Sequence, residues 1–153
     1  IHTGNHEQRT SLLVQLNPMK LVAERLHVPY FDWQAYHLWT VGDQKYKIHT
    51  HHGAGKATTP SGRLNQVLKM RNISRADLFL MGHVHDILDY ETKMYDWDEE
   101  AGTMKEIVQK YAVCGSLLSY HFSYAEQGMM APVSQRLIKI DLYKDRHDIK
   151  IYK

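Results

Sequence analysis

The chain has 153 residues, 43% hydrophobic and 24% charged, which is long enough for one domain with its own core and typical of a globular protein. Its net charge of +2 is too small to indicate a nucleic-acid partner, although it leaves one possible. The single cysteine, Cys114, excludes an internal disulfide framework and favours a reducing, cytoplasmic setting. Because no apolar run spans a bilayer, we expect no membrane partner, and nothing in the sequence indicates an oligomeric state.

Helical patterns come first along the chain. Apolar residues recur at helical spacing over residues 11–16 and 18–27, and Asn17-Pro18 between them suits a helix cap followed by the first helical residue. Residues 28–50 are rich in strand-forming residues and are interrupted by a turn at Gly42-Asp43-Gln44. A loop over 53–62 and a helix over 63–72 follow.

The rest of the chain favours strands. Residues 77–81 form a short apolar run that ends at Gly82, which is typical of a strand buried on both faces. Further strands are expected over 87–97, 104–114, 135–143 and 147–152, with turns over 98–102 and 144–146. Helices mixed with strands, followed by a series of strands, predict a layered α/β sandwich.

Histidine is the unusual component of the composition, with eleven copies, several beside glycine. Three motifs combine imidazole or amide ligands with a glycine that permits a sharp turn: Gly4-Asn5-His6-Glu7, His51-His52-Gly53 and Gly82-His83-Val84-His85. We expect them at strand ends, where α/β folds gather their ligands. Taken singly, each motif has a structural alternative, either an ordinary turn or packed histidines.

The middle motif leaves a choice between two ligands. Strand alternation places His49 and His51 on one face and His52 on the other, so these three histidines cannot all bind one ion. His49 is expected to pack within the sheet. Both His51 and His52 remain candidates at this stage.

Taken together and in this order, the motifs resemble those of the calcineurin-like metallophosphoesterase family, in particular its bacterial and phage-type members. The family pattern runs Asp-x-His, Gly-Asp-x-x-Asp, Gly-Asn-His-Asp/Glu, His-Gly and Gly-His-x-His, and residues 4–7, 52–53 and 82–85 match the last three blocks. The first two blocks do not occur in this chain. The resemblance therefore implies that residues 1–153 are an N-terminally truncated part of one four-layer αββα phosphoesterase domain.

The resemblance also implies a two-metal site. In that arrangement Asn5, His52 and His83 bind one divalent ion and His85 binds the other, while the catalytic His6 stabilises or protonates the leaving oxygen. Glu7 would orient its neighbours. The N and O ligands suit Mn, Fe, Zn, Co or Ni, of which Mn is favoured. Because the bridging aspartate belongs to the missing blocks, we expect the 153-residue chain alone to be inactive.

The expected activity is metal-dependent hydrolysis of phosphomonoesters or phosphodiesters. Two alternatives remain: a nuclease acting on DNA or RNA, and a non-catalytic scaffold with the same fold. A nuclease should carry a basic groove or an added DNA-binding domain, and the sequence indicates neither. A scaffold should have lost ligands, whereas every ligand expected within this stretch is present.

Overall fold

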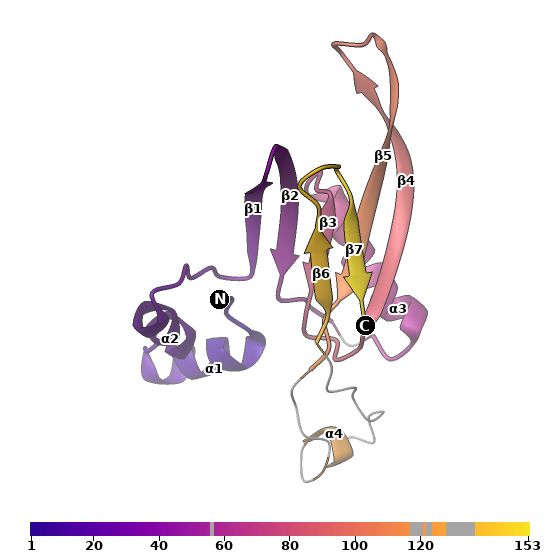
Figure 1. The fold of residues 1–153 in the computed structure, drawn as a ribbon. Coiled ribbons are helices and arrows are strands. Elements are labelled where there is room, and N and C mark those ends of the chain that lie inside the picture. Colours follow the sequence, from indigo (N-terminus) through magenta and orange to yellow (C-terminus); the bar gives the residue numbers. More distant parts are fainter. Residues whose placement is uncertain (56, 117–120, 122–123, 128–136) are drawn as a thin grey trace.

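The computed structural model describes residues 1–55, 57–116, 121, 124–127 and 137–153, which form a mixed α/β fold around a five-stranded sheet (Figure 1). In sheet order, the strands are β1 (Gln34–Val41), β2 (Gln44–His51), β3 (Leu78–Met81), β5 (Thr103–Val113) and β4 (Leu88–Asp98). The three central strands, β2, β3 and β5, run parallel, and each outer strand pairs antiparallel with its neighbour. The carboxyl ends of the three parallel strands therefore meet at one edge.

Two different layers cover the faces of this sheet. Helix α3 (Pro60–Leu68) and the 3-10 turn η1 (Lys69–Asn72) contribute Val67 and Met70 to a core with Phe79 and Tyr111 on one face. The hairpin of β6 (Lys139–Leu142) and β7 (Ile149–Tyr152) packs on the other face, where Ile149 meets the buried Tyr46, Ile48 and Leu78. The predicted layered α/β architecture is thus confirmed, with three layers among the described residues.

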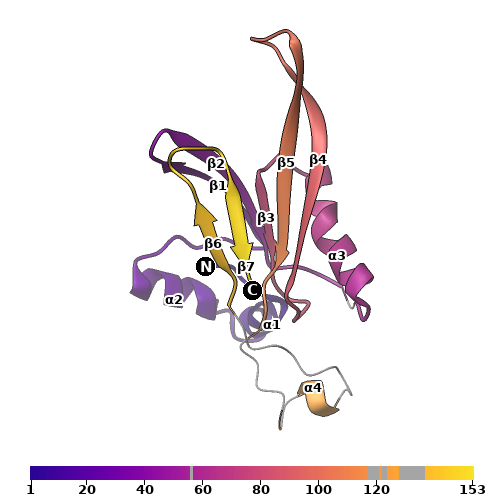
Figure 2. The ribbon, with the colours of Figure 1, turned by 45° about the vertical axis from the view of Figure 1, so that its right-hand side comes forward.

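Helices α1 (Asn5–Val14) and α2 (Pro18–Leu26) lie beside the β1 end of the sheet (Figures 1 and 2). Helix α2 begins as predicted, because the Asn17 side chain accepts hydrogen bonds from the backbone N–H groups of Met19 and Lys20. Helix α1 begins earlier than the predicted residue 11, since Gly4 serves as its N-cap and Glu7 accepts the Gly4 N–H at 3.1 Å. Neither helix buries its leucines, and Leu13 is 84% exposed.

The remaining boundaries shift by a few residues. Helix α3 starts at Pro60 rather than Arg63, because the Thr59 hydroxyl caps it by accepting the Gly62 N–H at 3.2 Å. The strand predicted over 135–143 is described only from residue 137 and is regular over Lys139–Leu142. A short helix, α4 (Tyr124–Gln127), lies beyond the carboxyl edge of the sheet (Figure 1). None of the described helices is long and apolar enough to cross a membrane.

Candidate metal centre

The site begins at the carboxyl edge of the parallel strands. Strand β2 ends at His51 and β3 at Met81, and His51 is paired with Met81 in the register of these strands. The backbone N–H of Gly82 donates to the His51 carbonyl at 3.3 Å, which joins the two chain segments just as they leave the sheet. The His-Gly and Gly-His motifs, about thirty residues apart in sequence, therefore adjoin in space.

Asn5 reaches the same edge from the first turn of α1. Its Oδ1 lies 3.2 Å from His52 Nε2. Asn5 is thus the first residue of a helix, which differs from the strand-end position expected from the sequence. The preceding segment is fixed by Thr3, whose N–H donates to the carbonyls of Phe31 and Asp32.

Two glycines permit this close approach. A Cβ atom on Gly4 would lie 2.7 Å from His52 Cε1 and 2.6 Å from Glu7 Oε2. Gly53 has a φ of +101°, and a Cβ there would meet the Gly82 carbonyl oxygen at 2.7 Å. Larger residues at these positions would separate Asn5, His52 and His83, so the glycines set the size of the site.

The two histidines of the last motif adopt a left-handed backbone conformation. His83 has a φ of +68° and His85 a φ of +51°. Such a conformation costs on the order of 1–3 kcal/mol for a non-glycine residue and clusters at functional sites. The His83 ring lies 5.1 Å from the His52 ring, centroid to centroid. His83 Nε2 is 3.1 Å from the Gly55 carbonyl, which can only accept, so Nε2 carries the proton and Nδ1 keeps its lone pair.

An ion pair stabilises the turn after β3, which carries His83 and His85. Arg63 Nη1 lies 2.7 Å from Asp86 Oδ2, and Arg63 Nε donates to the Ala57 carbonyl at 3.2 Å. Asp86 Oδ1 also accepts the Ile87 N–H at 2.8 Å. Arg63 therefore ties the loop after β2 to the turn after β3. Sequence reasoning missed this brace, because the two partners are 23 positions apart and match no short motif.

Burial favours the neutral form of two histidines of the site, His52 and His85. Burial is the main cause that lowers the pKa of His52, and the neighbouring His83 lowers it further, while Glu7 acts in the opposite direction. Burial likewise lowers the pKa of His85, with further contributions from His83, His6 and Arg63. A neutral imidazole keeps the lone pair that a metal requires. The influence of His6 on His85 also places these two residues near each other.

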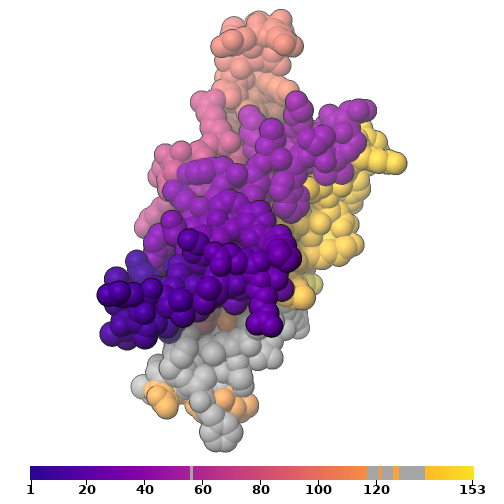
Figure 3. Space-filling model, turned by 90° about the vertical axis from the view of Figure 1, so that its left-hand side faces the viewer, coloured from indigo at the N-terminus to yellow at the C-terminus, as the bar shows by residue number. Residues whose placement is uncertain are grey.

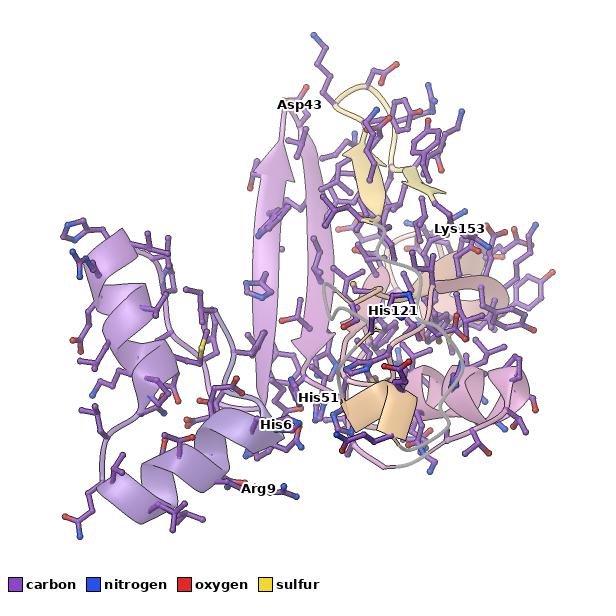
Figure 4. The ribbon with its side chains drawn as sticks, turned by 90° about the horizontal axis from the view of Figure 1, so that it is seen from below. His6, Arg9, Asp43, His51, His121 and Lys153 are labelled. Atoms are coloured by element: carbon purple, nitrogen blue, oxygen red, sulfur yellow. The ribbon has the colours of Figure 1, made fainter. Side chains whose placement is uncertain are left out.

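The two candidates of the middle motif have different hydrogen-bond partners. His51 Nδ1 accepts the N–H of Gly53 at 2.7 Å and so turns toward its own backbone. His52 faces Asn5 and His83. Figure 4 shows His6 on the first turn of α1, near the end of β2 where His51 lies, whereas Arg9 points away. His6 itself is exposed.

The structure brings Asn5, His52 and His83 together, with His85 and His6 close by. Among the described residues, however, no group of three or more His, Cys, Asp and Glu side chains converges tightly enough to hold a metal ion. The side chains that do meet there, Asn5, His52 and His83, are an amide and two imidazoles, with the Glu7 carboxylate beside His52. Comparison with protein-family models, curated proteins and solved structures finds no match to this chain.

Proposed function

We propose that the chain forms part of a metal-dependent phosphoesterase, with Asn5, His52 and His83 as ligands of one divalent ion. The observation that carries the proposal is the 3.2 Å separation of Asn5 Oδ1 and His52 Nε2. Two ligand atoms that each lie about 2.0–2.2 Å from one ion are themselves about 2.8–3.6 Å apart, from the smallest octahedral to the largest tetrahedral separation. The pair thus has the spacing that a shared ion requires.

The donor set fits a transition metal. An amide oxygen and imidazole nitrogens, without thiolate, suit Mn, Fe, Zn, Co or Ni, and we favour Mn. The hydrogen bond from His83 Nε2 to the Gly55 carbonyl is the outer-shell contact that commonly orients a metal-binding histidine. In the proposed site His85 binds a second ion.

In the proposed phosphoryl transfer, His6 and the amino-terminal end of α1 act together with the bound metal ions. When bound, a pair of divalent ions supplies an activated water and neutralises the phosphoryl oxygens. His6, exposed on the first turn of α1, is placed to donate a proton to the departing ester oxygen. The amino-terminal end of α1 adds a partial positive charge, which favours a phosphate at this position.

The proposal extends to the fold. The three layers of the described residues would be part of the four-layer αββα sandwich of this enzyme class. The cluster contains no carboxylate that could bridge two ions, so we propose that the bridging carboxylate comes from the two motifs that this sequence lacks. By the same reasoning, the 153-residue chain alone should bind metal weakly and should not turn over substrate.

The test is hydrolysis of bis(p-nitrophenyl) phosphate with added Mn²⁺ by two proteins: residues 1–153 alone, and a version that carries the two upstream motifs. The extended protein should hydrolyse the diester and lose activity with a chelator, whereas residues 1–153 should show only background turnover. Comparable turnover by the two would mean that residues 1–153 hold a complete site. Metal binding without turnover of mono- or diesters by the extended protein would instead favour the non-catalytic scaffold.

A further inference from the structure

A groove lies away from the histidine cluster. It has a volume of about 700 Å³ and is formed between the β4–β5 hairpin and the turn between β6 and β7. Asp77, which immediately precedes β3, lines it, so the groove is at the amino end of the parallel strands. The metal centre is at their carboxyl end. The two sites are therefore at opposite edges of the sheet.

One wall of the groove is an arm that projects from the molecule. Strands β4 and β5 are eleven residues each, and their far half extends beyond the other strands (Figures 1 and 3). Trp97 pairs with Met104 across the arm and the two are 58% and 54% exposed. Trp97 and Val108, which share one face of the arm, line the groove, as do Ile107 and, from β7, Ile149.

The lining of the groove carries a net negative charge, whereas the whole chain carries a net positive charge. Its lining contains three lysines and eight carboxylates, Asp77, Glu91, Asp96, Asp98, Glu99, Glu100, Glu106 and Asp148, an excess of five negative charges. The whole chain carries +2, so the remainder carries an excess of seven positive charges. A local potential of this sign attracts cationic partners and repels nucleic acid.

Some of these carboxylates already have partners within the arm. Lys93 bonds Glu106 at 2.9 Å, and Lys110 pairs with Glu91. Two arginines outside the arm pair with further lining carboxylates, Arg75 with Asp96 at 2.5 Å and Arg146 with Asp148 at 3.5 Å. Glu99 and Glu100, at the tip, take part in no ion pair of the described residues. The tip therefore offers the carboxylates that a cation would meet first, beside the exposed ring of Trp97.

We propose that this groove, which we call the arm groove, binds an extended, arginine- or lysine-rich segment of a partner protein. Cationic side chains would pair with Glu99 and Glu100, and a guanidinium would stack on Trp97, a contact that suits arginine. Strand β4 is an edge of the sheet and so offers backbone N–H and C=O groups to an extended segment. This inference is independent of the proposed phosphoesterase activity.

The probe is an octa-arginine peptide, titrated into residues 1–153 by calorimetry and by tryptophan fluorescence. We expect saturable, salt-sensitive binding with a change in tryptophan emission that Trp97→Phe abolishes, although Trp33 and Trp39 remain. Glu99→Lys combined with Glu100→Lys should raise the Kd at least about tenfold, the equivalent of 1.4 kcal/mol. Both positions are at an exposed turn, so the variant should keep the wild-type melting temperature.

The matched control is Glu24→Lys combined with Asp43→Lys, which makes the same change in net charge at exposed positions on α2 and at the β1–β2 turn. It should change the Kd by less than about threefold, because at 0.15 M salt charges this remote are screened. Equal weakening in the two double variants would show attraction to net charge alone and would overturn the proposal. So would the absence of saturable binding, or an emission change that survives Trp97→Phe.

Discussion

Asn5 Oδ1 and His52 Nε2 lie 3.2 Å apart although 47 positions separate the residues in sequence. The contact joins the first turn of α1 to the carboxyl end of β2, and Gly4 makes room for it. An amide and an imidazole gain only a modest hydrogen bond from this approach, so the contact contributes little to stability, and its proposed role as a shared metal site has to be tested by metal binding.

We predict that His83→Ala and His6→Ala have different effects in the extended protein that carries the upstream motifs. His83→Ala should lower metal affinity at least about tenfold, since loss of even an outer-shell partner costs that much. His6→Ala should lower the rate by about 10²–10⁴-fold, the usual contribution of a general acid, with the metal content unchanged. Metal content by mass spectrometry and kcat for each variant provide the test. Equal metal loss in both variants would identify His6 as a ligand.

We predict that Gly53→Ala destabilises the chain much more than Gly102→Ala. Both glycines have a positive φ, so each substitution incurs the left-handed penalty of about 1 kcal/mol. At Gly102 nothing lies within 4 Å of the new Cβ, whereas at Gly53 it would meet the Gly82 carbonyl oxygen at 2.7 Å. Gly53→Ala should therefore cost about 1–3 kcal/mol more, the usual cost of overpacking.

Thermal unfolding of the two glycine variants beside the wild type measures this difference. For a chain of this length, each kcal/mol corresponds to about 2–4 °C in melting temperature. Melting temperatures that fall equally in Gly53→Ala and Gly102→Ala would mean that the segments after β2 and β3 can separate without cost, and that Gly53 does not set the size of the site.

Local sequence signals predicted most of the elements. The apolar run before Gly82 gave β3, and Asn17-Pro18 gave the start of α2, because both signals act over a few neighbouring residues. The start of α1 was missed, since Gly4 caps the helix without a side chain and only Glu7, three positions on, marks the cap. A glycine followed three positions later by an acidic residue is the local signal that marks this cap.

The site was predictable only in part, because its components act over long range. The motifs named the histidines, but only the parallel pairing of β2 and β3 brings His52 beside His83. That His52 rather than His51 faces Asn5 also depends on the fold, in which His51 Nδ1 accepts the Gly53 N–H. The ion pair of Arg63 with Asp86 depends on where α3 packs, which no local pattern encodes.

We predict that Tyr46→Phe destabilises the chain through the hairpin of β6 and β7. The buried Tyr46 hydroxyl lies 2.6 Å from the Tyr143 carbonyl and accepts the backbone N–H groups of Tyr143 and Asp148 at 3.1 and 3.3 Å. Phenylalanine keeps the ring packing but leaves these backbone groups without that partner, at a cost of about 1–3 kcal/mol.

Denaturant unfolding measures this cost, with Tyr95→Phe as the control because Tyr95 is 66% exposed at the arm. The control should change the free energy of unfolding by less than about 0.5 kcal/mol. Hydrogen exchange at the amides of Tyr143 and Asp148 should also accelerate in Tyr46→Phe. Unchanged exchange at these two amides would mean that water replaces the Tyr46 hydroxyl and that its hydrogen bonds contribute little to stability.

The last prediction concerns the dependence of stability on pH. The His49 side chain is fully buried, with Nε2 3.2 Å from Gln34 Oε1 and Nδ1 2.9 Å from the Ser74 hydroxyl. Burial, with smaller effects of His51 and His37, lowers the pKa of His49 from 6.5 to about 4. Between these two values the unfolded chain binds a proton that the folded chain does not. The free energy of unfolding should therefore be at its plateau above pH 6.5 and fall as the pH is lowered toward 4.

Urea unfolding at several pH values between 7.5 and 4.5 measures this slope in the wild type, in His49→Gln and in a control. His49→Gln should have a lower free energy of unfolding at neutral pH. That free energy should fall less steeply as the pH is lowered, because the unfolded variant has no His49 to bind a proton. Some decline should persist, since burial also lowers the pKa values of His2, His37, His51, His52 and His85. The control is His27→Asn, at an exposed left-handed helix end that asparagine tolerates, and it should keep the wild-type slope. If His49→Gln declines as steeply as the wild type, His49 titrates alike in the folded and unfolded chains, and burial does not keep it neutral.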